Sequence, residues 1–345
     1  MLRRALTFYT KYFAVWVVGC GLVAFLWKDT PEHPNWFRVV GTYSLVELFP
    51  ADVLFRLPPT AVKHLNICLS MNTLFFAVTM FGIGVALQPD DFKRILKTPS
   101  AVALGTAAQF LVMPFGAYAI ARLFRLPAPL AVGLILTGAA PGAMASNTMS
   151  YVAKADAAYS VSLTTVSTLL CPVLTPLLTK LLAGSELPVS FWAMFLQIMV
   201  MVAVPLLLGF WVRHRFHRSV ERIVPVFPAV SATFIIFICS VVIARNQARL
   251  PQVTGSVLAV VLVLNLYGMG AGYGIGVLFG LDTLKRRALT IEVGMQNAGL
   301  GSALALEHLG EEAAIPAAIF VFVCIITASA LASAWQHRHD PQQSE

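Results

Sequence analysis

Charged side chains are scarce in this sequence. Asp, Glu, Lys and Arg make up 12% of its 345 residues, whereas hydrophobic residues make up 58% and the mean hydropathy is +0.78. Soluble domains carry about 25% charged residues, so this composition excludes an ordinary soluble globular protein. The sequence instead predicts an integral, multi-pass membrane protein that is embedded in the lipid bilayer.

Cysteine and histidine are sparse where a metal site would need them. The five cysteines are far apart, lie in apolar runs and form no Cys-x-x-Cys pair, so neither a disulfide framework nor a zinc site is predicted. No histidine lies near the centre of an apolar run, which argues against a transition-metal centre. The sequence also contains no P-loop and no catalytic motif. We therefore expect neither an organic cofactor nor an enzyme activity.

Long apolar runs, in contrast, are abundant. A membrane-spanning helix needs about 20 mostly apolar residues. Ten such runs lie at residues 11–27, 66–87, 100–124, 129–153, 157–181, 190–212, 225–244, 255–280, 284–308 and 313–335. We therefore predict an all-α protein with ten transmembrane helices in a single transmembrane domain. The long connection 28–65 contains the apolar run Leu45–Phe55, which is either a short interfacial helix or an extra partial span.

The distribution of basic residues predicts the orientation of these spans. The net charge of +8 does not indicate a nucleic-acid partner, because the basic residues lie mostly in short connections. With the N-terminus in the cytoplasm, cytoplasmic segments hold 15 of the 24 basic residues, so the positive-inside rule favours cytoplasmic N- and C-termini. Arg3-Arg4 resembles the start of a signal peptide, but no small-residue cleavage site follows Trp27. Because no transit peptide precedes the first span, we expect a bacterial inner membrane.

Two of the predicted spans contain a polar, Gly-rich interruption. The first is Ala140–Asn147, which includes Pro141-Gly142, and the second is Thr290–Gly301. Ten spans divide into two repeats of five, at about 11–181 and 190–335, and an odd number of helices makes the repeats inverted. The fourth span of each repeat is then the interrupted one. Broken segments at corresponding places in two repeats indicate the binding site of a secondary transporter.

Glu292 lies in the second interruption. It is the one acidic residue in the middle of a long apolar span, with only Glu47 ambiguous among the other acids. A charge at membrane depth costs about 2.5–3.5 kcal/mol on insertion scales, so it indicates a functional site. No basic residue lies near the centre of any span. The charge must therefore be compensated by a proton, by a metal cation, or by both at different times.

Oxygen-bearing side chains occur at positions from which they could surround a cation. Ser146 and Asn147 follow the first break, and Ser160 and Thr164 share one face of the next helix. Hard monovalent cations take oxygen ligands of these kinds. Small polar residues also pack membrane helices together, and an interhelical hydrogen bond is an equal alternative for Gln109, which stands alone in its span.

Several ordered fragments resemble the bile acid:sodium symporter family over roughly residues 66–335. The fragments are Met80-Phe-Gly-Ile-Gly with Leu87 and Asp91-Phe92, Gln109 with Pro114, Pro141-Gly142, Ala145-Ser-Asn147, Tyr151 with Lys154 and Asp156, Ser160, Thr164-Thr-Val-Ser-Thr-Leu, and Glu292-Val-Gly-Met-Gln-Asn297. The resemblance implies a panel domain and a core domain, with the fourth and ninth helices broken and crossing in the core. It also implies two bound sodium ions and import of organic anions by alternating access.

The resemblance also implies roles for individual residues. The first sodium site would use Ser146, Asn147, Ser160, Thr164 and Glu292, and the second would use Gln109, Glu292, Gln296 and the backbone carbonyls of Val293 and Met295. Substrate would meet Met144, Ala145 and Asn297. The family often has Gly-Gly-Thr after the proline, whereas this chain has Gly142-Ala143-Met144, so the substrate loses a hydroxyl contact there.

The expected function is therefore sodium-driven symport of a small organic anion, either a carboxylate or a conjugated sterol-like acid. One alternative is a proton-coupled organic anion transporter in which Glu292 carries the proton. A second alternative, of another class, is a membrane sensor or binding protein, although the sequence shows no obvious signalling domain.

Overall fold

Helices make up nearly all of the regular structure. The computed structural model describes residues 13–27, 30, 34–44, 46, 62, 69–184, 187–216, 220–221 and 223–336, and this part of the chain contains no β-strand. The helices are α2 (Phe13–Leu26), α3 (Trp36–Thr42), α6 (Met71–Ala86), α7 (Pro89–Lys97), α8 (Pro99–Leu123), α9 (Ala128–Ala139), α10 (Ala145–Val152), α11 (Ala157–Ala183), α12 (Phe191–Ile198), the π-helix η2 (Met199–Ala203), α13 (Val204–Arg215), the 3-10 turn η3 (Val224–Val226), α15 (Phe227–Arg245), α16 (Leu250–Leu278), α17 (Thr283–Gly294), α18 (Ala298–His308), the 3-10 turn η4 (Glu312–Ala314) and α19 (Ile315–Gln336).

Six of these helical segments, among the described residues, are long and apolar enough to cross a membrane. They are Pro99–Leu123, Ala157–Ala183, Phe191–Arg215, Val224–Arg245, Leu250–Leu278 and Glu312–Gln336. A seventh candidate is the pair α6 and α7, which meet at an angle of 77°. The prediction of an all-helical integral membrane protein is confirmed for this part of the chain. The apolar run Leu45–Phe55 falls almost wholly outside the described residues.

Two predicted spans are each divided into two shorter helices. The span predicted at 129–153 becomes α9 and α10, and the span predicted at 284–308 becomes α17 and α18. Helix α9 ends at Ala139 because Pro141 lacks a backbone N–H and disfavours helical geometry in the residue before it. In the second span, Asn297 caps α18 through its side chain, which accepts a hydrogen bond from the Leu300 N–H.

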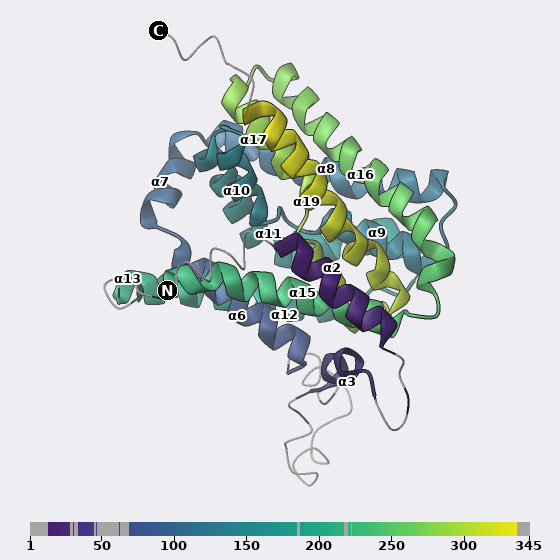
Figure 1. Ribbon diagram of the computed structural model, residues 1–345. Coiled ribbons are helices and arrows are strands. Elements are labelled where there is room, and N and C mark those ends of the chain that lie inside the picture. Colours follow the sequence, from purple (N-terminus) through teal and green to yellow (C-terminus); the bar gives the residue numbers. More distant parts are fainter. Residues whose placement is uncertain are drawn as a thin grey trace.

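The helices form two packed groups (Figure 1). Helices α13 and α15 run across the lower half of the view and pack against α6, which extends below them, while most of α16, α17 and α19 lies above them. Helix α2 packs on α15, although it lies far from it in sequence. The second group is held together by contacts of α8 with α9, α11 and α16, and of α16 with α17 and α19. Both broken segments belong to this second group.

Glycines allow α6 and α13 to approach closely. A Cβ atom on Gly84 would lie 2.0 Å from the Leu206 carbonyl oxygen, and one on Gly209 would lie 2.1 Å from the Phe81 carbonyl oxygen. Each helix therefore places a glycine against the backbone of the other. Membrane helices pack by such close backbone contact because lipid supplies no hydrophobic drive for their association.

We expect Gly84→Ala to destabilise the protein by about 1–3 kcal/mol, because its methyl group must push α6 and α13 apart. The measurement is the thermal unfolding temperature of the protein purified in detergent. Gly274→Ala in α16 is the matched control, since nothing lies within 4 Å of a Cβ atom there. Equal unfolding temperatures for the two variants would contradict this account of the crossing.

Candidate functional site

The two helix breaks pair with each other through their backbones. Gly142 and Gln296 form an isolated antiparallel bridge. The Ala143 N–H donates to the Met295 carbonyl at 2.9 Å, and the Asn297 N–H donates to the Pro141 carbonyl at 2.8 Å. Unwound backbone is tolerated at membrane depth only where protein, water or an ion satisfies its polar groups. Here each break supplies hydrogen-bond partners for part of the unwound backbone of the other.

Glu292 lies in the last turn of α17, directly before the second break. Its side chain is buried, with 1% of its surface exposed. The Ser146 hydroxyl of α10 donates to Oε2 at 2.6 Å, and the Ser160 hydroxyl of α11 donates to the same oxygen at 2.8 Å. The Thr164 hydroxyl donates to Oε1 at 2.6 Å. The carboxylate thus joins α17 to the half-helix and the full helix that follow the first break.

The Glu292 carboxylate has no basic partner in the described part of the chain, where no Lys or Arg nitrogen lies within 4.0 Å of it. The salt bridges of that part join other residues, such as Asp282 to Lys285 at 2.6 Å and Glu312 to Arg249 at 2.9 Å. A buried carboxylate needs both hydrogen bonds and a compensating charge. The hydroxyls supply hydrogen bonds but no charge.

The oxygens around Glu292 outnumber the hydrogens between them. The hydroxyls of Ser146, Ser160 and Thr164 make seven oxygen–oxygen contacts of 2.6–3.1 Å with the carboxylate, the Asn147 Oδ1 atom and backbone carbonyls. Three hydroxyls carry three hydrogens. Turning the Asn147 amide would add two, and protonating Glu292 would add one, so neither change reaches seven. The carboxylate, hydroxyl and amide oxygens gathered here are of the kinds that hard cations take as ligands, and the donor set therefore fits a hard cation.

Gly142 is the point where the first break touches the carboxylate. A Cβ atom at this position would lie 2.2 Å from Glu292 Oε1 and 3.1 Å from its carboxyl carbon. The backbone of the break can approach the carboxylate this closely only because residue 142 has no side chain. The sequence indicated that Gly142 breaks the helix, and the structure adds this close contact.

The second predicted set of ligands lies around Gln296. The Gln109 side chain of α8 donates from Nε2 to Gln296 Oε1 at 2.5 Å, and Gln296 Nε2 donates to the Val293 carbonyl at 2.9 Å. The Met295 carbonyl accepts the hydrogen bond from Ala143 described above. Gln109 Oε1 is buried and has no hydrogen-bond partner among the described residues. A buried oxygen without a donor is costly, and a bound cation would remove this cost.

The residues predicted to meet substrate lie at the starts of the two half-helices. Met144 is half-buried and Ala145 is exposed at the beginning of α10. Asn297 is half-buried at the beginning of α18, and the nearby Gly299 faces Phe234 of α15. Because the breaks pair antiparallel, Met144 and Asn297 lie at opposite ends of the pairing.

Two residues that contact the breaks were not predicted from the sequence. Asn265 of α16 is fully buried, and its Nδ2 atom donates to the Gly294 carbonyl at 2.8 Å. Thr175 of α11 donates to the Ala139 carbonyl at 2.7 Å. The signal for Asn265 was the same as for Gln109, namely one amide side chain in the middle of an apolar run. Thr175 carried no such signal, because threonines are common in that helix.

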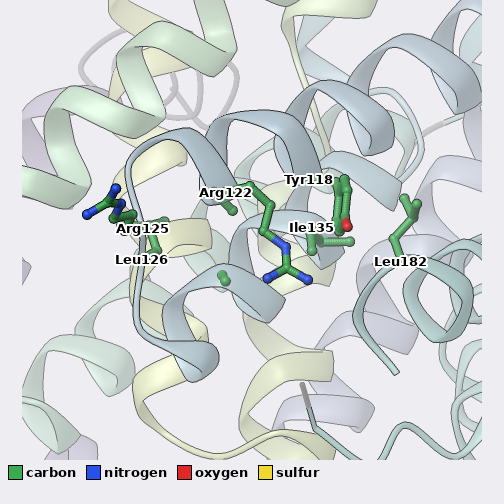
Figure 2. A pocket seen from close by; sticks show the side chains of 8 residues that line it. Tyr118, Arg122, Arg125, Leu126, Ile135 and Leu182 are labelled. Atoms are coloured by element: carbon green, nitrogen blue, oxygen red, sulfur yellow. The ribbon is translucent and has the colours of Figure 1, made fainter. Parts of the chain in front are cut away.

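A separate cavity of about 220 Å³ lies near the far ends of α8 and α11 (Figure 2). It is lined by Tyr118, Ala121, Arg122, Arg125, Leu126, Ala131, Ile135 and Leu182. The Arg122 guanidinium lies over the Tyr118 ring, 5.4 Å from its centre. None of the predicted site residues lines this cavity, so it is distinct from the oxygen cluster around Glu292.

Comparison with known proteins finds several relatives that are named as sodium-dependent transporters. The sequence matches the Sodium Bile acid symporter family over residues 73–252. It is 40% identical to the uncharacterized sodium-dependent transporter YocS of Bacillus subtilis over 80% of this chain and 86% of that protein. It is 34% identical to the probable chloroplastic sodium/metabolite cotransporter BASS2 of Oryza sativa, over 91% of this chain and 76% of that protein. It is also 34% identical to BASS1 of Arabidopsis thaliana, a probable chloroplastic sodium/metabolite cotransporter, over 78% of this chain and 67% of that protein. The names of these relatives describe transporters and not enzymes, and the chain belongs to the sodium bile acid symporter family.

Proposed function

We propose that this protein is a secondary active symporter that couples the import of a small organic anion to two sodium ions. The observation that carries the proposal is the buried Glu292 carboxylate, which contacts three hydroxyls from α10 and α11 and has no basic partner among the described residues. Such a site is most stable when a cation is bound, so it responds directly to sodium.

The first sodium site comprises the side chains of Ser146, Asn147, Ser160, Thr164 and Glu292. Its support is the excess of oxygen contacts over available hydrogens. Asn147 Oδ1 contributes two of these contacts, at 2.9 Å from the Ser160 hydroxyl and 3.1 Å from the Thr164 hydroxyl. All members except Asn147 are buried, so a cation there would be largely shielded from water.

The second sodium site comprises Gln109, Gln296, Glu292 and the carbonyls of Val293 and Met295. Its support is the oxygen of Gln109, which has no hydrogen-bond partner in the described part of the chain, and the contact of that side chain with Gln296. In this proposal Glu292 belongs to both sites. Two sodium ions at these sites would therefore share one formal negative charge.

Substrate meets Met144, Ala145 and Asn297, at the starts of α10 and α18. A helix N-terminus presents free N–H groups and a positive dipole end, which favour an anion. The relatives named sodium/metabolite cotransporters agree with a small organic substrate. We infer a carboxylate or a conjugated sterol-like acid.

The proposed architecture has ten spans in two inverted repeats, at about 11–181 and 190–335, in a bacterial inner membrane with cytoplasmic termini. Its support is that the fourth and ninth spans are the broken ones and that their breaks pair antiparallel. Helices α2, α6, α12, α13 and α15 form the panel, and the remaining spans form the core.

Alternating access requires the panel and the core to separate, and their contact at the end of α18 is polar. Asn72 of α6 donates to Glu307 of α18 at 3.3 Å, and His308 of α18 contacts Gln197 of α12. Polar side chains can exchange such contacts for water when they separate. In the proposed orientation these contacts lie on the outer side, where the substrate enters.

Two sodium ions and one monoanion carry one net positive charge inward. A membrane potential of 100 mV contributes about 2.3 kcal/mol per charge, to which the sodium gradient adds. Sodium and anion must each raise the affinity for the other, because coupling between two sites is reciprocal.

Proton coupling through Glu292 is the second candidate. A buried carboxylate without a basic partner could bind a proton, which is the observation that favours it. A proton would bind to one carboxylate oxygen, whereas a hard cation takes several oxygen ligands such as those gathered here. The oxygen cluster therefore favours sodium.

Removing the charge of Glu292 tests the proposal directly. We expect Glu292→Gln to abolish sodium-dependent uptake and to weaken sodium binding about 100-fold, or about 2.8 kcal/mol, because the site loses its only formal charge. Uptake into proteoliposomes and the sodium-induced rise in unfolding temperature provide the two measurements. Glu312→Gln, which alters a surface ion pair with Arg249, is the matched control. Normal sodium-driven uptake by Glu292→Gln would overturn the assignment.

The close contact at Gly142 yields a second prediction. We expect Gly142→Ala to lose most of the sodium-induced stabilisation, because its methyl group displaces the carboxylate at a cost of about 1–3 kcal/mol. Gly301→Ala is the control, since the nearest atom to a Cβ there is 3.5 Å away. A wild-type sodium titration for Gly142→Ala would show that the carboxylate does not need this contact.

The coupling ion and the substrate are tested together by uptake into proteoliposomes. Radiolabelled small carboxylates and conjugated sterol acids are each offered under an inward sodium gradient, and under a pH gradient in sodium-free buffer. We expect accumulation of one substrate class under the sodium gradient alone. Accumulation driven by the pH gradient without sodium would instead establish proton coupling.

A further inference from the structure

Gln109 and Asn265 occupy equivalent places in the two proposed repeats. Each is an amide in the third span of its repeat, and each is buried. Gln109 donates to the Ala140 carbonyl at 3.4 Å, 31 residues further along the chain. Asn265 donates to the Gly294 carbonyl at 2.8 Å, 29 residues further along. Each amide therefore supports a carbonyl that the break of its own repeat has freed.

The two amides share a second property. Gln109 Oε1 and Asn265 Oδ1 are both buried and have no hydrogen-bond partner among the described residues. Gln109 belongs to the proposed second sodium site, whereas the family resemblance gave Asn265 no role. Because the two amides are placed equivalently, we ask whether Asn265 of α16 also contributes to the second sodium site.

Two glycines of α16 allow Asn265 to lie close to the break. Asn265, Gly268 and Gly272 lie at i, i+3 and i+7, on one face of the helix. A Cβ atom on Gly268 would lie 3.0 Å from the Val293 carbonyl oxygen, and one on Gly272 would lie 2.8 Å from the Leu289 carbonyl oxygen. The glycines allow backbone contact with α17, so the short asparagine side chain reaches Gly294.

The bond from Asn265 fixes the peptide unit at the start of the break, where α17 ends. That unit carries the Gly294 carbonyl at one end and the Met295 N–H at the other, and the N–H donates to the Glu292 carbonyl at 3.2 Å. Because a peptide unit is planar, bonds at both ends set its orientation. The carbonyls of Val293 and Met295, on either side of it, are the proposed backbone ligands of the second sodium ion.

We propose that Asn265 is a positioning residue for the second sodium site: it holds the Gly294 carbonyl so that the flanking carbonyls of Val293 and Met295 face the ion. This inference rests on the proposed sodium coupling. It assigns to α16 a part in sodium binding without requiring contact between Asn265 and the ion.

The test is a sodium titration of the unfolding temperature for the purified full-length protein, at constant ionic strength with potassium replacing sodium. For the wild type we expect cooperative stabilisation by two ions. For Asn265→Leu, which removes the donor but keeps a similar volume, we expect the sodium midpoint to rise about tenfold, or about 1.4 kcal/mol. The Hill coefficient should fall toward one, because the first site stays intact while the second weakens.

Comparison of the two salts separates positioning from simple packing. If Asn265 had a purely structural role, its substitution would lower the unfolding temperature equally in sodium and in potassium. If it is a positioning residue, the substitution lowers mainly the rise in unfolding temperature that sodium produces. Thr179→Val is the control, because Thr179 is also buried and its hydroxyl, among the described residues, bonds only to the Thr175 carbonyl of its own helix. Asn265→Ser, which is too short to reach Gly294, serves as a second variant and should reproduce the shift of Asn265→Leu.

The outcomes distinguish this inference from the proposed function. Absence of sodium stabilisation in the wild type would overturn sodium coupling and this inference with it. A normal wild-type titration together with unchanged midpoints and Hill coefficients in both Asn265 variants would overturn the role of Asn265 alone. Should Asn265→Leu not fold, the Asn265→Ser titration decides the question by the same criteria.

Discussion

The structure depends on one unbalanced interaction, a carboxylate buried in an apolar bundle with hydroxyls around it and no basic partner in the described residues. Glu292 is held by Ser146, Ser160 and Thr164 at 2.6–2.8 Å. These bonds fix the carboxylate in place but leave its charge uncompensated, and the cost of burying a charge is reduced most by an opposite charge. Low-dielectric surroundings strengthen every interaction that such a charge makes. The same burial that makes an uncompensated carboxylate unfavourable therefore makes this site sensitive to a cation.

The helix breaks bring this carboxylate, which belongs to the second half of the chain, against partners from the first half. An unbroken α9–α10 segment could not place Gly142 against the carboxylate, since helical backbone is covered by its own side chains. Breaking two helices frees carbonyls and N–H groups at a depth where no lipid atom can satisfy them. The breaks satisfy part of this requirement mutually, through the pairs Ala143 with Met295 and Pro141 with Asn297. Side chains of neighbouring helices, among them Thr175 and Asn265, satisfy further carbonyls.

The sequence predicted the helices and the breaks more completely than the contacts between them. Apolar runs and proline chemistry are local signals, so the ends of α9 and α17 followed from Pro141 and from the Gly-rich stretch after Glu292. The approach of Gly142 to Glu292 is not local, because it depends on how two segments 150 residues apart cross. Asn265 was missed although it carried the same signal as Gln109, since a lone amide in an apolar run indicates a contact but not its partner. The family resemblance, and not the pattern, supplied the grouping of oxygens into two sites.

The arrangement explains how ion binding could be transmitted to the substrate side. The carboxylate and the break backbones form one connected unit, because Glu292 touches Gly142 and the residues next to Gly142 pair with Met295 and Asn297, just before α18. A ligand shifts a conformational equilibrium only by as much as its affinity differs between the states. A cation that draws the surrounding oxygens together favours the state in which the breaks are paired, and that pairing orients the first turns of α10 and α18. In the proposed mechanism, ions and anion need not touch each other to be coupled, since both would act on the relative placement of the same two short segments.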